Sequence, residues 1–342
     1  MISSENFNKN PSSDPIKEPI STDPYFFSMP KELKTSLDSM LESSQNKNAP
    51  NFWHKNICDE LYVPVDDGEI RVFHYLPKDP ISKRPLVFIP GWGVNPAGFQ
   101  DLFSAIYEKV ELYYIESREK KSSHIRFWGS KFDMHQKAKD ISAAITYLDL
   151  NEKNYVLMGP CWGGAVIMQG LMDKVLTKAP TVITVDPMHR LWFSKFALKW
   201  ITPFIPTFMF TLLKPIIKWF KLHNMHEPTQ KSRAEAFIAD AVMWKWKRAA
   251  QQVNEFELFG NLSVVEKEVF VINGTNDLIH DQRDYPKIAA ELPKSRFLFL
   301  GTDESNRELL MGMVAEEFTK ILQNDQIPPS LLPFEKAIQR GS

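Results

Sequence analysis

The residues with the clearest chemical potential lie in Gly159–Gly163, which reads Gly-Pro-Cys-Trp-Gly. The apolar run Val156–Met158 precedes them and helix-compatible residues follow, which predicts a strand, a tight turn and a helix. A cysteine at such a corner lies at a helix N-terminus, where the helix dipole favours the thiolate, the nucleophilic form. The glycines Gly159 and Gly163 fit because larger side chains would collide with neighbouring backbone. The pattern predicts a nucleophile elbow at Cys161; a buried structural cysteine is the alternative.

A sheet has to position this corner, and the rest of the chain predicts one. From Glu60, two strand-like runs, ELYVPV and IRVFHYL, flank an Asp-Gly turn, which indicates a hairpin. Strand-like and helical stretches then alternate, the strands being PLVFIPGWG, ELYYIES, NYVLMG, TVITVD, EVFVING and RFLFLG. This alternation predicts an α/β fold with a mostly parallel, doubly wound sheet. Reactive groups collect at the carboxyl ends of such strands. The charged stretch from Glu116 to Ser123 at that edge is expected to be a solvated loop, with contact to a substrate as the alternative.

The order of these motifs resembles that of the α/β-hydrolase superfamily over roughly Glu60 to Leu322. The resemblance rests on the hairpin, the Pro-Gly-Trp-Gly after the third strand, the elbow, and the Gly-Thr-Asn-Asp after a later strand. It implies that Cys161 is the nucleophile and Asp277 the acid of a triad. It also implies an oxyanion hole made by the backbone N–H groups of Trp92 and Trp162, whose donors would stabilise developing negative charge. Alternatively, Asp277 only shapes a turn and Trp92 is a pocket wall.

The base of the triad is missing from the position that the resemblance implies. A histidine is expected after the last strand, where this chain reads Gly-Thr-Asp-Glu-Ser and Glu304 occupies the histidine position. None of the eight histidines comes after His280. In this fold the end of TVITVD lies beside the elbow strand, so His189, which follows it, is the candidate base, with Asp186 as an alternative acid. A satisfied or solvated histidine is the ordinary alternative.

The segment between the sixth and seventh strands is apolar and basic. Between Met188 and His226 it has no Asp or Glu and six Lys or Arg, interleaved with Trp, Phe, Leu and Ile. The resemblance implies a helical cap here, over residues 190–262, with an apolar pocket for a lipid-like acyl substrate. The composition also fits peripheral contact with an anionic membrane, or a cap whose lysines snorkel outward. The run Trp200–Leu213 is too short to span a bilayer and contains two prolines, so no span is expected.

Composition and charge narrow the remaining classes. The formal net charge of the 342 residues is −1, which gives no field for binding nucleic acid. The two cysteines, Cys58 and Cys161, fit a reducing, cytoplasmic compartment, with membrane association through the cap left open. No metal and no cofactor are expected. The domain prediction is a mobile tail over residues 1–50 that includes a short helix, a core over 51–189 and 263–325, the cap, and a C-terminal tail over 326–342.

Two functions remain open at this point. In the first, the protein is a hydrolase or acyltransferase that acts through Cys161 on an ester or thioester of an apolar acyl group. In the alternative, it is a catalytically degenerate relative, a pseudoenzyme that binds a hydrophobic ligand or a protein partner. The base discriminates between them, because a His189 that does not reach Cys161 leaves the first function without that general base.

Overall fold

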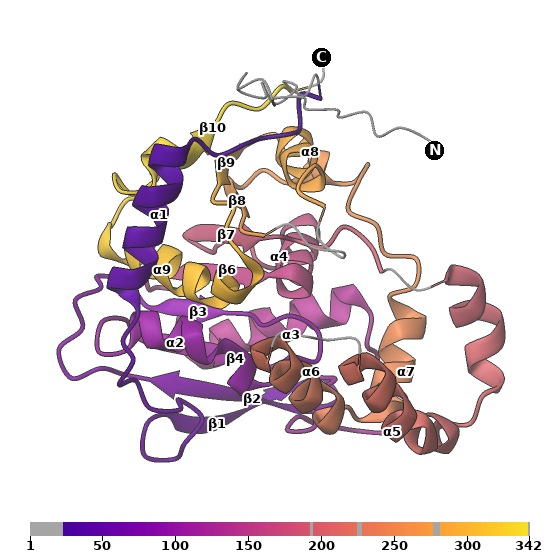
Figure 1. Cartoon of the computed structure of the whole chain (residues 1–342). Coiled ribbons are helices and arrows are strands. Elements are labelled where there is room, and N and C mark those ends of the chain that lie inside the picture. The colour runs from indigo at the N-terminus through magenta and orange to yellow at the C-terminus, as the bar shows by residue number, and fades with distance from the viewer. Residues whose placement is uncertain (1–22, 192–193, 224–227, 276–280, 341–342) are drawn as a thin grey trace, which may run out of the picture.

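The computed structural model describes residues 23–191, 194–223, 228–275 and 281–340. Within these ranges a ten-stranded sheet forms the centre of the molecule, in the order β1-β2-β4-β3-β6-β7-β8-β9-β10, with β5 paired to β2 (Figure 1). The strands are β1 Asp59–Val65, β2 Gly68–Tyr75, β3 Leu86–Phe88, β4 Leu112–Ile115, β5 His124–Ile125, β6 Val156–Pro160, β7 Thr181–Val185, β8 Val269–Asn273, β9 Ser295–Phe299 and β10 Glu335–Lys336. The six strands from β4 to β9 in this order are parallel, and the β1–β2 hairpin leads the sheet, as predicted.

Helices cover both faces of the sheet. On one face, α3 Met134–Tyr147, α4 Cys161–Met172 and α8 Asp284–Glu291 pack in one hydrophobic cluster. On the other, α1 Lys31–Ser44, α2 Gln100–Ile106 and α9 Arg307–Lys320 pack in a second. The central strands β6, β7 and β8 are buried along their whole length, because both of their faces are covered. The fold prediction is thereby confirmed.

Both chain ends contribute more to the core than their predicted tails would. Leu37 and Leu41 of α1 are buried, with exposed fractions of 0% and 2%, in the cluster that contains α9. Near the C-terminus, Leu331 and Phe334 are buried and β10 pairs with β9. The short helix that the domain prediction allowed within residues 1–50 is thus part of the core, as are Leu331 and Phe334 of the stretch 326–342. A few apolar residues at helical spacing secure α1, although its overall composition is polar.

The insertion between β7 and β8 is helical. It contains a π-helix η2 Ala197–Ile201, a 3₁₀ helix η3 Thr202–Phe204, and the helices α5 Thr207–His223, α6 Pro228–Asp240 and α7 Met243–Gln252. Short 3₁₀ helices elsewhere are η1 Pro96–Phe99, η4 Leu262–Val264, η5 Glu304–Asn306 and η6 Leu332–Phe334. No single helix in the described part of the chain is long and apolar enough to span a membrane. The segments Ala197–Phe204 and Thr207–Phe220 meet that criterion only together, with a bend of 104° between them.

Candidate functional site

The corner between β6 and α4 has the backbone of a nucleophile elbow. Cys161 is the first residue of α4 and has a φ of 50°, in the left-handed region that a residue with a Cβ rarely adopts. Such strain is typical of functional positions. A Cβ at Gly163 would lie 2.1 Å from the carbonyl oxygen of Ile89, and one at Gly159 would lie 2.8 Å from the carbonyl carbon of Gly163. The turn is thus so tight that both positions require glycine.

The loop after β3 lies directly against Cys161. A Cβ placed on Gly91 would come within 3.8 Å of the Cβ of Cys161. The next residue, Trp92, packs against Trp162, with 5.4 Å between the ring centroids. Because Trp162 is in the first turn of α4, its backbone N–H has no acceptor within the helix. The two N–H groups predicted for an oxyanion hole therefore belong to two segments that meet at the thiol.

Helices α6 and α7 of the insertion close over this loop. Gly93, with a φ of 70°, leaves room for two aromatic rings: a Cβ there would lie 2.5 Å from Trp246 and 2.6 Å from Phe237. The ring of Trp246 also meets that of Trp92 edge-on. Phe237 and Trp246 thus form an aromatic roof beside the thiol.

The indole nitrogens of Trp92 and Trp162 are unsatisfied. Both Nε1 atoms are buried and have no hydrogen-bond acceptor among the described residues. A buried donor without an acceptor is costly, so such groups in native proteins usually have a water or ligand partner. The two indoles are therefore able to donate to a water molecule or to a ligand that carries oxygen acceptors.

Of the two candidate acids of the triad, Asp186 lies within the described residues and Asp277 does not. Asp277, and also His280, lie outside the described residues. Asp186, weighed as an alternative acid, is fully buried, and its carboxylate accepts hydrogen bonds from the backbone N–H of Gly274 at 2.7 Å and the hydroxyl of Thr275 at 3.0 Å. Asp186 therefore holds the end of β8, the strand that leads to Asp277.

His189 is engaged by two carboxylates. Its Nδ1 lies 3.0 Å from Glu257 and its Nε2 lies 3.4 Å from Asp284. Burial lowers the pKa of His189, but the hydrogen bonds with Asp284 and Glu257 outweigh it, so the pKa is raised above its usual value. These contacts join His189 to two acids, while the residue before it, Met188, donates its backbone N–H to the carbonyl oxygen of Cys161 at 3.1 Å. The predicted role as base would require the ring to give up one of them.

Glu304 lies at the start of η5, and it is exposed. The last helix begins only at Arg307, three residues further on, with no side-chain cap. The residue in the histidine position thus lies on the surface.

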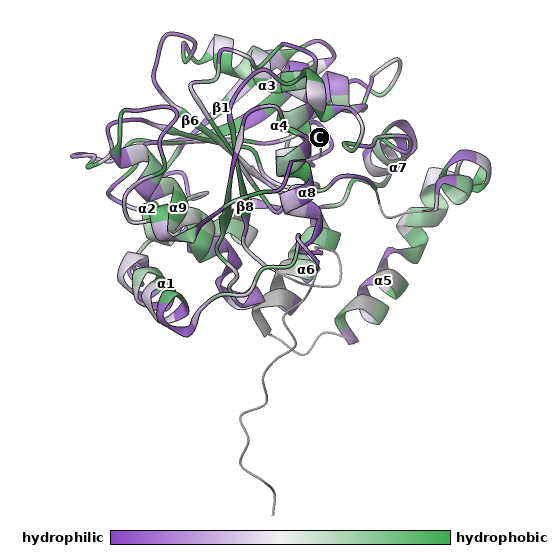
Figure 2. Cartoon of the chain, turned by 90° about the horizontal axis from the view of Figure 1, so that it is seen from above, coloured by the Kyte–Doolittle hydropathy of each residue, from purple (hydrophilic) through white to green (hydrophobic). Residues whose placement is uncertain are grey.

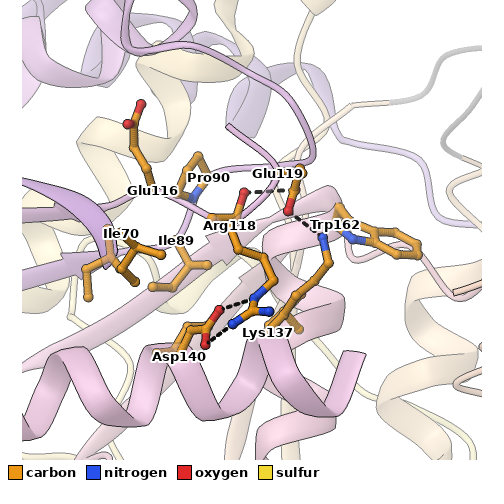
Figure 3. Close-up of a pocket in the computed structure, with 13 residues that line it drawn as sticks. Ile70, Ile89, Pro90, Glu116, Arg118, Glu119, Lys137, Asp140 and Trp162 are labelled. Carbon is orange, nitrogen blue, oxygen red and sulfur yellow. Dashed lines mark hydrogen bonds and ion pairs between the residues drawn. The ribbon is translucent and has the colours of Figure 1, made fainter. Parts of the chain in front are cut away.

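The loop after β4 is buried, and the prediction of a solvated loop is wrong. Exposed fractions are 2% for Glu116 and 0% for both Arg118 and Glu119. Burial is tolerated because the charges are paired across elements (Figure 3). Arg118 forms two hydrogen bonds to Asp140 of α3, at 2.6 and 2.9 Å, and Glu119 pairs with Lys137 of the same helix at 2.6 Å.

This ion-pair cluster reaches the candidate site. Nζ of Lys137 lies 4.9 Å from the centroid of the Trp92 ring, a cation–π contact. A cavity of about 20 Å³, with room for roughly one water molecule, lies among these charges and Trp162. The sequence carried a signal for this cluster, because Lys137 lies on the same helical stripe as Met134 and Ile141, which are buried.

Cys58 provides a contrast within the chain. It is buried on the far side of the sheet, in the cluster that contains α1, and burial raises the pKa of its thiol to about 12. Neither cysteine forms a disulfide. Of the two, Cys161 is the more exposed and the one placed at a helix N-terminus.

Comparisons with known proteins identify the fold. Neither a protein-family model nor the sequence of a curated protein matches the chain. An esterase from Exiguobacterium antarcticum matches with a TM-score of 0.56 at 14% identity, over 71% of this chain and 92% of the esterase. A bromoperoxidase from Bacillus anthracis matches with a TM-score of 0.56 at 13% identity, over 77% and 97%. A membrane phospholipase A, described as a bacterial virulence factor, matches with a TM-score of 0.53 at 13% identity, over 79% and 83%.

The chain therefore has the α/β-hydrolase fold, as the order of its motifs implied. At these identities the similarity establishes the fold and leaves the chemistry to the residues of the site.

Proposed function

We propose that this protein is an acyl hydrolase or acyltransferase that uses Cys161 to attack an ester or thioester with an apolar acyl group. The observation that carries the proposal is the strained backbone of Cys161 at the N-terminus of α4, with the Gly91–Trp92 loop in contact with it. A residue with a Cβ is held in the left-handed region only where the surrounding structure enforces it.

In the proposed reaction, Sγ of Cys161 attacks the acyl carbon as a thiolate, which the N-terminus of α4 favours. The carbonyl oxygen takes up the negative charge and is stabilised by the backbone N–H groups of Trp92 and Trp162. From an ester, the intermediate expels an alkoxide, which takes a proton from water and leaves as the alcohol. From a thioester, it expels a thiolate. Water, or another acyl acceptor, then releases the acyl group from the resulting thioester at Cys161.

The apolar character of the substrate is inferred from the roof. Phe237 and Trp246 lie over the Gly91–Gly93 loop, and the indoles of Trp92 and Trp162 contribute N–H donors without acceptors in the described structure. Aromatic walls with a few polar groups are typical of sites for apolar molecules that carry an oxygen-bearing end. The structural neighbours named as esterase and phospholipase support an ester of this kind.

One observation favours the second candidate, a degenerate relative that binds a hydrophobic ligand or a partner protein without reaction. His189 is held by Glu257 and Asp284, and Glu304 is exposed, so the residue in the family's histidine position does not supply a base. Under this reading the aromatic site binds the ligand, and Cys161 is a bystander.

Alkylation of Cys161 as a function of pH decides between the two. Because the pKa of Cys58 is about 12, a small iodoacetamide pulse near neutral pH labels Cys161 selectively, and peptide mass spectrometry confirms the site. The proposal predicts an apparent pKa well below about 8.5 and hydrolysis of p-nitrophenyl esters that is lost in Cys161→Ala and retained in Cys58→Ala. An apparent pKa at or above about 8.5, with ester hydrolysis equal in both variants, would establish the binding protein instead.

A further inference from the structure

Helix α5 has its apolar face turned outward. Seven large apolar side chains on this helix are exposed, with exposed fractions between 42% and 69%: Phe208, Met209, Leu212, Leu213, Ile216, Trp219 and Phe220. Their spacing of three and four residues places them on one side of the helix. In a globular protein this side of an amphipathic helix normally packs against the core. Here it is the side that is exposed in the described part of the chain.

The polar side of α5 is the one that holds the helix to the protein. Nζ of Lys214 donates hydrogen bonds to the carbonyl oxygens of Ala239 at 2.8 Å and Ala241 at 3.2 Å, at the end of α6. One turn later, Lys218 forms an ion pair with Glu235 of the same helix. Because both cations point toward α6, the outward direction of the apolar side is fixed by specific contacts.

The apolar side continues into the segment before α5. Phe196, Trp200, Ile201 and Phe204 are also exposed, with fractions between 49% and 83%. We call the ten side chains on η2, η3 and α5, together with Phe196, the outer apolar face. Helix α5, which carries seven of these side chains, lies at the edge of the molecule, away from the sheet (Figure 2). The area of the outer apolar face is on the order of 1,000 Å², above the roughly 300–600 Å² of the largest patch on a typical monomer.

The charge of this region discriminates between the partners that could cover such a face. Residues 188–226 include six Lys or Arg and no Asp or Glu. Lys214 and Lys218 are turned toward α6 and Lys199 pairs with Glu255, so these three do not decide between partners. The exposed Lys195, next to Phe196, would meet its own copy in a symmetric contact, which is unfavourable. An anionic lipid surface offers both an apolar interior and the opposite charge. Trp200 and Trp219 are of the residue type that concentrates at the boundary between water and lipid.

We propose that the outer apolar face docks on the surface of an anionic lipid bilayer, with η2, η3 and α5 lying in the plane of the interface. This docking is independent of any reaction at Cys161. Since α5 packs on α6 and α7, the docked orientation would bring the aromatic roof close to the lipid.

Vesicle flotation with the full-length protein tests the proposal. Binding is compared between vesicles of phosphatidylcholine alone and vesicles with about 30% phosphatidylglycerol, at low salt and at about 0.5 M NaCl. The test variant is Phe208→Ser/Leu212→Ser/Ile216→Ser, whose wild-type side chains are 63%, 69% and 61% exposed. The matched control is Leu76→Ser/Ile81→Ser/Leu332→Ser, at 62%, 64% and 51%, which lie outside the insertion.

The wild type and the control should float with the anionic vesicles, more weakly at high salt and with phosphatidylcholine alone. The test variant should lose about tenfold or more of this binding while keeping its thermal midpoint, since these side chains are exposed. Failure of the wild type to bind anionic vesicles, or equal binding by the test variant, would overturn the proposal. A dimer in light scattering that only the test variant abolishes, without vesicle binding, would instead make the face a contact between two copies.

Discussion

Replacing Gly163 by alanine tests whether the elbow is as tight as the structure shows. The new Cβ would lie 2.1 Å from the carbonyl oxygen of Ile89 and 2.9 Å from that of Pro90. Both atoms belong to the backbone that ends β3 and starts the Gly91–Trp92 loop, so no side chain can rotate away. Relief requires α4 and the β3 loop to separate by about 1 Å in a close-packed interior.

The magnitude follows from two opposing terms. Overpacking of a core costs about 1–3 kcal/mol, and backbone atoms on both sides put this site at the upper end. Gly163 lies within α4, where alanine is favoured over glycine by about 1 kcal/mol. The net loss in the free energy of unfolding is therefore about 2 kcal/mol. With a urea m-value of about 3 kcal/mol/M, the midpoint falls by roughly 0.7 M.

Gly91→Ala is the matched control, because it alters the partner loop without this clash. Its Cβ would meet Val94 at 3.7 Å and the Cβ of Cys161 at 3.8 Å, both ordinary contacts. The urea midpoint should remain at or slightly above that of the wild type, since alanine restricts the unfolded chain. Alkylation of Cys161 should slow several-fold, because the new methyl group crowds the thiol. A Gly163→Ala midpoint that matches the wild type, or one no lower than that of Gly91→Ala, would refute the reasoning.

Two further substitutions test the charged groups around the site. Asp140→Asn leaves the fully buried Arg118 without its bidentate partner and should lower the free energy of unfolding by about 3–5 kcal/mol in chemical denaturation. Glu255→Gln, in the exposed pair with Lys199, should lower it by less than about 1 kcal/mol. Similar losses for both variants would contradict the burial argument. The raised pKa of His189 means that its protonated form stabilises the fold below the unfolded-state pKa of about 6.5, and that this contribution disappears as pH rises through the folded-state pKa. The thermal midpoint of the wild type should therefore exceed that of His189→Gln by more at pH 6 than at pH 8.5. A difference between the two midpoints that does not change with pH would show that the two carboxylates do not hold a charged ring.

The sheet and the elbow could be predicted from the sequence because their signals are local. An apolar run ends in Gly159, and the reactive residue Cys161 is followed two positions later by Gly163. Together these features specify a strand, a turn and a helix within eleven residues. The same holds for the β1–β2 hairpin, where an Asp-Gly turn separates two apolar runs. In both cases the backbone requirement and the residues that satisfy it are adjacent in the chain.

The charged loop after β4 could not be predicted in this way. A run of Glu, Arg and Lys is ordinarily solvated, and its burial depends on partners in α3 that lie about twenty residues away. Lys245 of α7 adds a further contact to this loop, through the carbonyl oxygens of Lys120 and Ser123, from more than a hundred residues away. Composition reports how much charge a segment carries, whereas burial is decided by whether every charge finds a partner.

The same distinction explains why Cys161 was easier to place than its base. A thiol at an elbow depends on its immediate neighbours, and the strained φ of Cys161 shows that they hold it as expected. A base depends on which nitrogen faces the thiol, and for His189 both nitrogens face Glu257 and Asp284, residues from the end of the insertion and from α8. Each of those carboxylates stabilises the imidazolium, and a protonated imidazole cannot accept a proton. To act on Cys161 the ring would have to leave at least one of these carboxylates, which makes the alkylation profile of Cys161 the most direct measure of whether this elbow reacts.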